Sequence, residues 1–197
     1  MNINELLRGL SADERFARLA DFDPARMDYT MRIQRPDGTI CVIRNPKEEA
    51  DGTLTDKQHV IGDGTAVLAV GTAFFDWVNK IQLTIGIDID TNDNHASGLD
   101  NASFERTLDA VRRVPWLEAR RSTGGKGLHL FPKFAYPVDV ASRAEGSALA
   151  RAAITLASRV AGFDFKAVKD CAGGNMWVYR NDAAATPTKS LKKQLRH

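Results

Sequence analysis

Apolar and polar residues alternate on both sides of Pro36-Asp37-Gly38, in the stretch YTMRIQRPDGTICVIR at residues 29–44. This alternation predicts a β-hairpin with the Pro-Asp-Gly triplet as its turn. Residues 45–66 are polar and rich in turn-forming residues, so they are expected to form a loop with mobile parts. The pattern at residues 65–78 fits a strand or a helix.

Helical periodicity predicts three helices. The first covers residues 11–20, where Ser11 and Glu14 form a capping box. The second follows a cap at Asn101 or Ser103, and the third covers EGSALARAAITLASRVAGF and stops at Gly162. The residues expected to face the core are Phe104, Leu108 and Val111 in the second helix and Leu149, Ala153, Leu156 and Val160 in the third.

Strands are predicted at residues 81–90, 116–121, 128–131 and 175–180, with the glycine-rich turn STGGKG joining the second to the third. Strands and helices are interspersed, without a regular alternation of one strand and one helix. The pattern therefore favours an α+β fold with a mainly antiparallel sheet.

Composition is that of a soluble globular protein: 43% of residues are hydrophobic, 26% are charged, and the net charge is +2. No apolar run reaches the ~20 residues of a membrane span, and the first residues lack the apolar core of a secretion signal. We therefore expect a cytoplasmic protein without a membrane partner. Cys41 and Cys171 have no zinc-type spacing and are expected to be reduced.

Two carboxylates interrupt the end of an apolar strand in GIDID, at residues 86–90. Asp88 and Asp90 are two residues apart, so their side chains leave the sheet on the same side, about 7 Å apart at Cα. Like charges this close repel each other, and a pair of Mg²⁺ or Mn²⁺ ions would relieve the repulsion and suit phosphoryl transfer. The alternative is a strand end whose two carboxylates are hydrated and bind nothing.

The segment RRSTGGKGLHLF is the second candidate for chemistry. Glycines allow backbone amides to approach an anion, Lys126 adds a positive charge, and His129 faces away from Leu128 and Leu130 on its strand. The Walker A pattern is absent. A flexible hairpin turn with an incidental histidine is the alternative to a triphosphate clamp.

A third segment, KDCAGGNMWVYR, places Asp170 before two glycines and a strand. Asp170 is either a turn residue or a third acid. Asp164, in FDF, competes with it for that role. Trp177 is more typical of a core position than of a base-stacking surface.

Together, GIDID, STGGKGLHLF and GFDFKAVKDCAGGNMWVYR resemble the motifs of the archaeo-eukaryotic primase superfamily, in the primase-polymerase domains of phage and plasmid type. The resemblance covers roughly residues 65–182. It implies Asp88, Asp90 and Asp170 as catalytic metal ligands for two Mg²⁺ or Mn²⁺ ions. The nucleotide-binding residues that it implies, with their neighbours in the turn, are Arg121, Ser122, Gly124, Gly125, Lys126, Gly127 and His129.

The same resemblance implies an RRM-like antiparallel sheet that carries the acids, joined to a smaller N-terminal α/β unit. We expect one catalytic domain, with residues 1–64 as the N-terminal part, 65–182 as the core and 183–197 as a basic tail. The implied activity is template-dependent DNA priming or polymerisation, with single-stranded DNA template, primer and NTP or dNTP as partners. Arg32, Arg35 and Arg44 are candidate template contacts, and the chain is expected to be part of a longer replication protein, such as one with a helicase domain.

Two functions of other classes remain open. A metal-dependent nuclease or phosphodiesterase would use the same acids but leaves the glycine turn without a purpose. A non-catalytic RRM-like binding module would need exposed aromatic residues for stacking, and the chain is only 8% aromatic.

Overall fold

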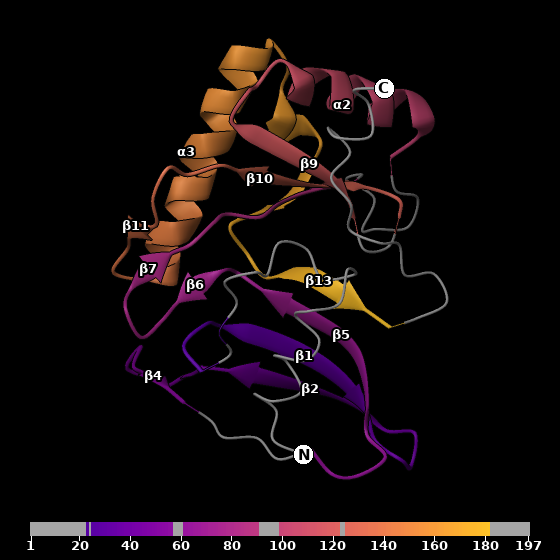
Figure 1. The fold of residues 1–197 in the computed structure, drawn as a ribbon, viewed down its shortest axis with the longest axis vertical. Coiled ribbons are helices and arrows are strands. Elements are labelled where there is room, and N and C mark those ends of the chain that lie inside the picture. Colours follow the sequence, from indigo (N-terminus) through magenta and orange to yellow (C-terminus); the bar gives the residue numbers. More distant parts are fainter. Residues whose placement is uncertain (1–22, 24, 57–60, 91–98, 123–124, 182–197) are drawn as a thin grey trace.

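The computed structural model describes residues 23, 25–56, 61–90, 99–122 and 125–181, with the backbone alone at residues 169–171. The helix predicted at residues 11–20 and the basic tail lie outside this part of the chain. The described residues form two four-stranded antiparallel sheets, one above the other in Figure 1, with helices packed on the upper one. The predicted α+β class with mainly antiparallel sheets is confirmed.

The lower sheet has the strand order β13-β5-β1-β2. Its strands are β1 (Tyr29–Gln34), β2 (Ile40–Asn45), β5 (Ala66–Thr72) and β13 (Met176–Arg180). The predicted β1–β2 hairpin is confirmed, and Gly38 in its turn has φ 84°, in the region that favours glycine. Because β5 and β13 come from the segment expected to form the core, this sheet joins residues from both sides of the boundary placed at residue 64.

The upper sheet has the strand order β12-β8-β10-β9 and carries the two helices. In chain order its elements are β8 (Ile87–Ile89), α2 (Asn101–Arg112), β9 (Leu117–Arg121), β10 (Leu128–Pro132), α3 (Arg143–Ala161) and β12 (Lys169–Ala172). This β-α-β-β-α-β order with antiparallel neighbours is the arrangement of ferredoxin-like folds. A short 3-10 helix, Phe165–Ala167, precedes β12.

The single strand predicted at residues 81–90 is wrong, because the chain changes sheets inside it. β7 (Ile81–Gln82) pairs with β6 (Phe75–Asp76) and β11 (Val138–Asp139), whereas β8 begins at Ile87. At the break, a Cβ on Gly86 would overlap the Met176 side chain, and the Gly86 carbonyl accepts a hydrogen bond from Gly173 N (2.9 Å). Both pieces are largely buried, which explains why the apolar pattern looks continuous.

The loop predicted at residues 45–66 is wrong over the part that forms a small two-stranded arm, β3 (Lys47–Glu48) with β4 (Leu54–Thr55). Its turn is stabilised by Asp51 Oδ1, which accepts a hydrogen bond from Thr53 N (2.9 Å), and by Gly52 with φ 82°. The arm is short and polar, so it lacks the apolar alternation by which strands are recognised. Residues 65–78, left ambiguous by the sequence, form β5 and β6.

Helix α2 starts with a different cap from either candidate. Asp100 is the N-cap, and its Oδ1 accepts a hydrogen bond from Ser103 N (2.7 Å). Ser103 therefore supplies the capped N–H and does not act as the cap. The predicted core positions Phe104, Leu108 and Val111 are all buried, as the helical spacing requires.

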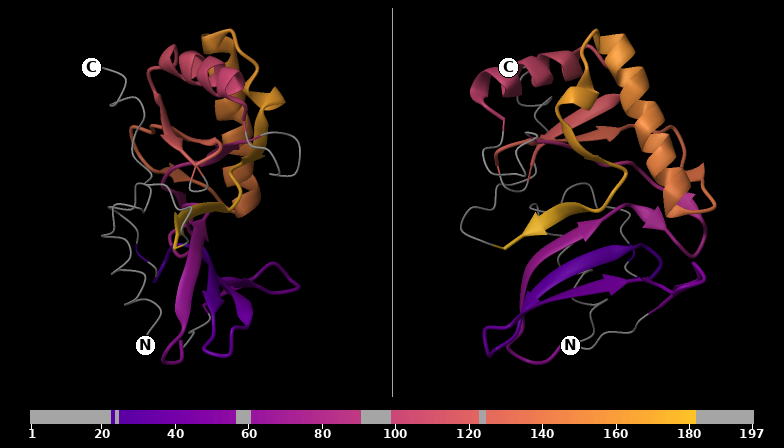
Figure 2. Two further views of the ribbon diagram at one scale, coloured as in Figure 1. Left: turned by 90° about the vertical axis from the view of Figure 1, so that its right-hand side faces the viewer. Right: turned by 180° about the vertical axis from the view of Figure 1, so that it is seen from behind.

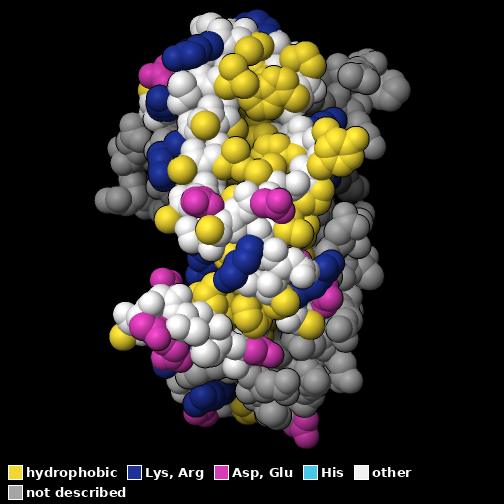
Figure 3. Space-filling view, turned by 90° about the vertical axis from the view of Figure 1, so that its left-hand side faces the viewer, with side chains coloured by type: hydrophobic (Ala, Val, Ile, Leu, Met, Phe, Trp, Pro, Cys, Tyr) yellow, Lys and Arg dark blue, Asp and Glu magenta, His cyan; other side chains and the backbone are white. Residues whose placement is uncertain are grey.

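Helix α3 and its stop at Gly162, which has φ 60°, are confirmed. The predicted core face is wrong at Leu156 and Val160, whereas Leu149 is half-buried and packs against the upper core. The buried residues are Gly146, Ala150, Ile154, Ala157 and Ala161, whereas Leu156 and Val160 are 52% and 47% exposed. Small residues let the helix axis approach the sheet closely, so the larger side chains of the neighbouring stripe stay outside. Figure 3 shows apolar side chains gathered on the outer surface of this part of the molecule.

Each sheet has its own hydrophobic core. The lower core contains Tyr29, Met31 and Val70, and the upper core contains Ile87, Leu128 and Ile154 with residues of α2. Phe131 of the upper sheet joins the lower core, where it packs edge-on against Phe74 with ring centroids 5.8 Å apart. None of the helices described here is long and apolar enough to cross a membrane.

Candidate active site

The two faces of the upper sheet differ sharply in character. Ile87, Ile89, Leu128 and Leu130 are fully buried on the face that packs against α2 and α3. Alternation along β8 and β10 places Asp88 and His129 on the opposite face. Asp90, two residues after Asp88, follows the same alternation just past the end of β8. We call this side of the sheet the acid face.

His129 lies directly across from Asp88 in the β10–β8 pairing. Its Nε2 is 3.6 Å from Asp88 Oδ1, so the two groups are close, but the distance between them is longer than that of a normal hydrogen bond. His129 is 2% exposed, whereas the Asp88 side chain is 23% exposed. Within the described part of the chain, His129 Nδ1 is buried and has no hydrogen-bond partner. The imidazole thus lies beside the Asp88 carboxylate, and its Nδ1 can still form a hydrogen bond.

Burial lowers the pKa of His129 to about 4, because the charged ring would lose its hydration. The Asp90 carboxylate opposes this shift by favouring the protonated ring, although the shorter contact is to Asp88. At neutral pH the ring is therefore uncharged. A neutral imidazole donates one hydrogen bond and accepts another, so it can bind a phosphate oxygen without adding charge.

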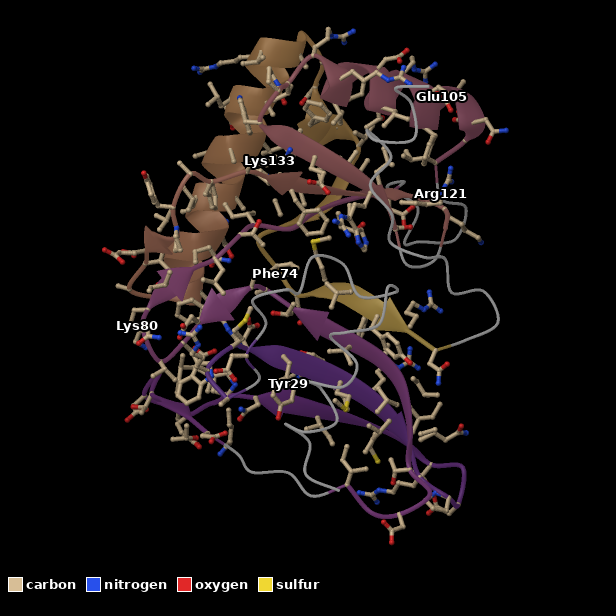
Figure 4. All side chains as sticks on the ribbon, in the orientation of Figure 1. Tyr29, Phe74, Lys80, Glu105, Arg121 and Lys133 are labelled. Carbon is tan, nitrogen blue, oxygen red and sulfur yellow. The ribbon has the colours of Figure 1, made fainter. Side chains whose placement is uncertain are left out.

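The acid face lies where the upper unit, which is the β12-β8-β10-β9 sheet with its helices, meets the lower unit, which is the β13-β5-β1-β2 sheet. Phe131 follows His129 on the same side of β10, with ring centroids 6.4 Å apart, and reaches the lower core at Phe74. Figure 4 shows Phe74 between the two sheets. Sites formed between packed units are common places for ligands, because two walls converge there.

The glycine turn is held by its own hydrogen bonds. Ser122 Oγ accepts from Gly127 N (3.0 Å), and the Ser122 carbonyl accepts from Gly125 N (2.9 Å). A Cβ on Gly127 would collide with the Ile89 carbonyl, so glycine allows the turn to lie against the end of β8, next to Asp90. Lys126 is exposed, and Gly124 lies outside the described residues. The structure thus brings the turn and the acid-bearing strand together, with the Gly125 and Gly127 amides used inside the hairpin.

Arg121 does not lie on the acid face. Its guanidinium stacks over Phe104 of α2, 4.4 Å from the ring centroid, and Nη1 donates to the Gly125 carbonyl (3.2 Å). Figure 4 shows Arg121 at the end of β9, on the side of α2. The prediction that it contacts the nucleotide is therefore not supported by its position.

Arg120 and Glu118 are the residues that sequence reasoning missed. Arg120 lies directly across from His129 in the β10–β9 pairing, and its Nε is 3.0 Å from Glu118 Oε1. Their side chains are 17% and 10% exposed. The alternation of Leu117, Glu118, Ala119 and Arg120 carries this signal, but it becomes readable only once the β9–β10 register is known.

Asp170 lies on β12, the strand that pairs with β8. The pairing changes register between Lys169, opposite Ile89, and Cys171, opposite Asp88, so Asp170 falls at the irregularity beside the acid pair. Its side chain is not among those that the structure describes. Asp164 is exposed and caps the 3-10 helix, with Oδ1 accepting from Lys166 N (2.9 Å). Of the two competing acids, Asp170 is the one next to β8.

Among the side chains that the structure describes, no three of His, Cys, Asp and Glu form a group able to hold a metal ion. Asp170 is not in that set, so the three-acid site stays a prediction. Asp88 and Asp90 supply oxygen ligands of the kind that Mg²⁺ and Mn²⁺ prefer. Their partial exposure leaves them accessible to a hydrated ion.

The three arginines predicted to contact template, Arg32, Arg35 and Arg44, are all exposed. Arg32 lies opposite Val42, and Arg44 opposite Thr30, in the β1–β2 pairing. Arg32 and Arg44 thus share the outer face of the lower sheet, and Arg35 lies beyond the end of β1.

Comparison with known proteins gives one remote likeness. No protein-family model and no curated protein matches the chain. Among solved structures it is similar to the polymerase domain from Mycobacterium tuberculosis ligase D in complex with DNA, with a TM-score of 0.34 and 12% identity over 84% of this chain and 67% of that chain. A likeness this remote does not establish a family, so the function has to be inferred from the site.

Proposed function

We propose that the chain catalyses template-dependent nucleotidyl transfer, as a DNA primase or DNA polymerase domain of the archaeo-eukaryotic primase superfamily. One observation carries this proposal: Asp88 and His129 are cross-strand neighbours on the face of the sheet that the helices leave uncovered. The glycine turn beside Ile89 supports it, because a metal-bound triphosphate needs acids and a phosphate-binding segment at the same place.

Asp88 and Asp90 would hold the divalent ions, Mg²⁺ or Mn²⁺, with Asp170 as the third ligand. Bound there, the two ions would supply charge neutralisation for the reacting phosphates and a lowered pKa for the attacking hydroxyl. The role of this chain's residues is to keep the carboxylates on one side of β8 and close to β12.

His129 would bind the triphosphate as a neutral donor. Arg120, directly across from it, would add positive charge, partly balanced by Glu118. The Ser122 hydroxyl accepts from Gly127 N, which leaves its own proton free to donate to a phosphate oxygen. The substrates are NTP or dNTP with a single-stranded DNA template and a primer, and a cytoplasmic setting fits them.

Replacing both acids tests the catalytic assignment. Asp88→Ala with Asp90→Ala should abolish nucleotide incorporation on a primed template, because the metal ligands are lost. The matched control is Asp109→Ala with Asp139→Ala, which removes two exposed carboxylates, one on α2 and one on β11, and should leave incorporation unchanged. Undiminished extension by the Asp88/Asp90 variant would refute the assignment.

Binding of a labelled triphosphate separates the proposal from its rivals. A polymerase should bind it only when Mn²⁺ or Mg²⁺ is present, and neither a nuclease nor a simple binding module requires that. A nuclease would instead degrade DNA in the absence of any triphosphate. Synthesis assays with and without a primer, comparing NTP with dNTP, would then distinguish priming from extension and identify the preferred sugar.

A further inference from the structure

A hollow lies away from the acid face, between β2, the arm of β3 and β4, and the start of α3. Its volume is about 640 Å³, and it is lined by Val42, Ile43, Arg44, Pro46, Lys47, Glu48 and Arg143. Figure 3 shows the surface hollowed between the arm and the upper part of the molecule, with Lys and Arg side chains at the edge. We call this hollow the basic groove.

The basic groove opens on the opposite side of the upper sheet from the candidate active site. Arg143 begins α3, and α3 packs on the apolar face of that sheet, whereas Asp88 and His129 lie on the other face. In the left view of Figure 2, α3 and the arm lie on the same side of the molecule. A ligand in the basic groove therefore does not occupy the acid face.

Cations outnumber carboxylates among the lining residues, with Arg44, Lys47 and Arg143 against Glu48. Lys47 is also paired with Glu49 on the arm, so a phosphate at Lys47 has to compete with that ion pair. Arg143 forms an ion pair with Asp28, with its Nη2 3.4 Å from Asp28 Oδ2. The Arg143 side chain is still 39% exposed. A guanidinium held on one side keeps further N–H donors for a phosphate.

Asp28 is well suited to this anchoring role. It is 2% exposed and accepts hydrogen bonds from Thr72 Oγ1 (3.1 Å), Ala73 N (3.1 Å) and Phe75 N (2.9 Å). These bonds fix the carboxylate in the lower unit, so the start of α3 is tied to β5 and the segment after it. The wall of the groove at the start of α3 is thus tied to the lower unit.

An aliphatic surface accompanies the cations. Val42 is 54% exposed on the outer face of the lower sheet, between Arg44 on its own strand and Arg32 across the β1–β2 pair. Ile43 and Pro46 line the groove beside it. Cations interleaved with apolar groups suit a chain that alternates phosphates with sugars and bases.

We propose that the basic groove binds the sugar–phosphate backbone of single-stranded nucleic acid, with Arg44, Lys47 and Arg143 contacting phosphates and Arg32 extending the track. The choice of nucleic acid over another polyanion rests on the proposed function. The groove supplies affinity without base specificity, because its contacts are to phosphate and sugar.

The test measures binding of a fluorescein-labelled oligothymidylate across a range of salt concentrations. It uses the full chain carrying Asp88→Ala and Asp90→Ala, in chelator, so that the candidate active site contributes no metal-dependent binding. Arg44→Glu with Lys47→Glu in this background should weaken binding at least tenfold. The slope of log K against log salt should fall by about 1.4, because each phosphate that a cation neutralises on a single strand contributes about 0.7 to it.

Arg151→Glu with Arg159→Glu is the matched control, because it reverses two exposed charges of α3 outside the groove and changes net charge equally. This control should keep most of the parent's affinity. Equal loss in both variants would mean diffuse attraction and would overturn the proposal, as would parental binding by the groove variant. Arg44→Gln with Lys47→Gln, which should show a smaller loss in the same direction, replaces the groove variant if thermal unfolding shows that charge reversal harms the fold.

An acidic protein partner is the other outcome. If polyglutamate binds in a manner that depends on Arg44 and Lys47 while the oligonucleotide does not, the groove is a peptide site and the proposal is wrong. Failure of the proposed function is seen separately, as absence of nucleotide incorporation by the unmodified chain. Strand binding by the Asp88/Asp90 variant does not depend on that result.

Discussion

Burial governs the chemistry of His129, because a charged imidazole would lose its hydration at a position that is only 2% exposed. The Asp90 carboxylate favours the charged ring, but it offsets burial only in part. The histidine is therefore a neutral hydrogen-bonding group next to an acid pair. A charged histidine there would neutralise the carboxylates that are proposed to hold metal ions.

Stability should depend on pH through this residue. Its pKa is about 4 in the folded chain against about 6.5 when unfolded, so between these values the unfolded state takes up the proton and the folded state does not. The stability that depends on an uncharged His129 is fully present above pH 6.5 and is lost as pH falls. At pH 4 the free energy of unfolding should be lower by about 3 kcal/mol for this reason. Urea unfolding in chelator should show a steeper decline for the parent than for His129→Gln, and parallel curves would contradict the shifted pKa.

The same residue should affect substrate binding more than turnover. His129→Ala removes the neutral donor proposed for the triphosphate, so KM for the nucleotide should rise about tenfold, the effect of one hydrogen bond to a charged group. The kcat should change less, because the proposed metal ligands stay in place. Steady-state kinetics on a primed template measure both values, and an unchanged KM would remove His129 from this role.

Residue types were easier to predict than their directions. Asp88, Asp90 and His129 could be assigned to one side of their strands by alternation alone, and the pairing of β10 with β8 places Asp88 opposite His129. Arg121 and Arg120 could not be separated in this way, because the side they face depends on the β9–β10 register. The structure does not describe the side chain of Asp170, so its role as a third metal ligand stays a prediction.

At the scale of elements, α3 shows how packing selects among possible helix faces. The stripe of Leu156 and Val160 is more hydrophobic than the stripe of small residues, yet the small residues face the sheet. The small side chains of the buried stripe allow the helix to lie close to the sheet. A periodicity argument weighs spacing and hydrophobicity but not this close approach, and it therefore selects a face that is partly wrong.

Two substitutions on α3 should separate these faces. Ile154→Ala leaves a cavity at a position that is 1% exposed and should lower the free energy of unfolding by about 3 kcal/mol. Leu156→Ala removes a side chain of similar size that is 52% exposed, and its cost should stay below about 1 kcal/mol. Urea titration of both variants measures the difference. Equal losses would show that the stripe with Leu156 is packed after all.

Elements set by local sequence were predicted well, and those set by distant partners were not. The β1–β2 hairpin is specified by Pro36-Asp37-Gly38, and the end of α3 by Gly162, within a few residues of chain. The break at residues 83–86 depends on Met176 and Gly173, which are about half the chain away in sequence. No window around Gly86 contains that information.

At the scale of the whole molecule, the position of the two helices determines on which side of the upper sheet each polar surface lies. The helices cover one face of the upper sheet and leave the acid face uncovered, and the basic groove lies on the helix side. The α+β class followed from interspersed elements, but the exchange of strands between sheets did not, because β5 joins β1 and β13 joins β5 only through tertiary contacts. Surfaces formed between elements, such as the groove, leave almost no sequence signature.

Gln82 links the two units, so its loss should affect the whole molecule. It is 3% exposed, and its Nε2, which carries two N–H donors, lies within hydrogen-bond distance of the carbonyls of Ala73 (2.7 Å), Phe74 (3.2 Å) and Thr84 (2.6 Å). Its Oε1 lies close against Gly146 at the start of α3. The side chain thus joins the segment after β5 in the lower unit to the helix that covers the upper sheet.

Gln82→Leu should leave these carbonyls without their donor and lower the free energy of unfolding by about 2–4 kcal/mol. Gln34→Leu is the control, because Gln34 Nε2 also donates to a carbonyl, that of Gly38 (3.3 Å), but at an exposed site where water replaces the bond. Chemical denaturation followed by both fluorescence and circular dichroism should show one early transition for Gln82→Leu if the units unfold together. Two separate transitions in the parent would show that Gln82 does not couple them, and a loss no larger than that of Gln34→Leu would show that its buried bonds contribute little.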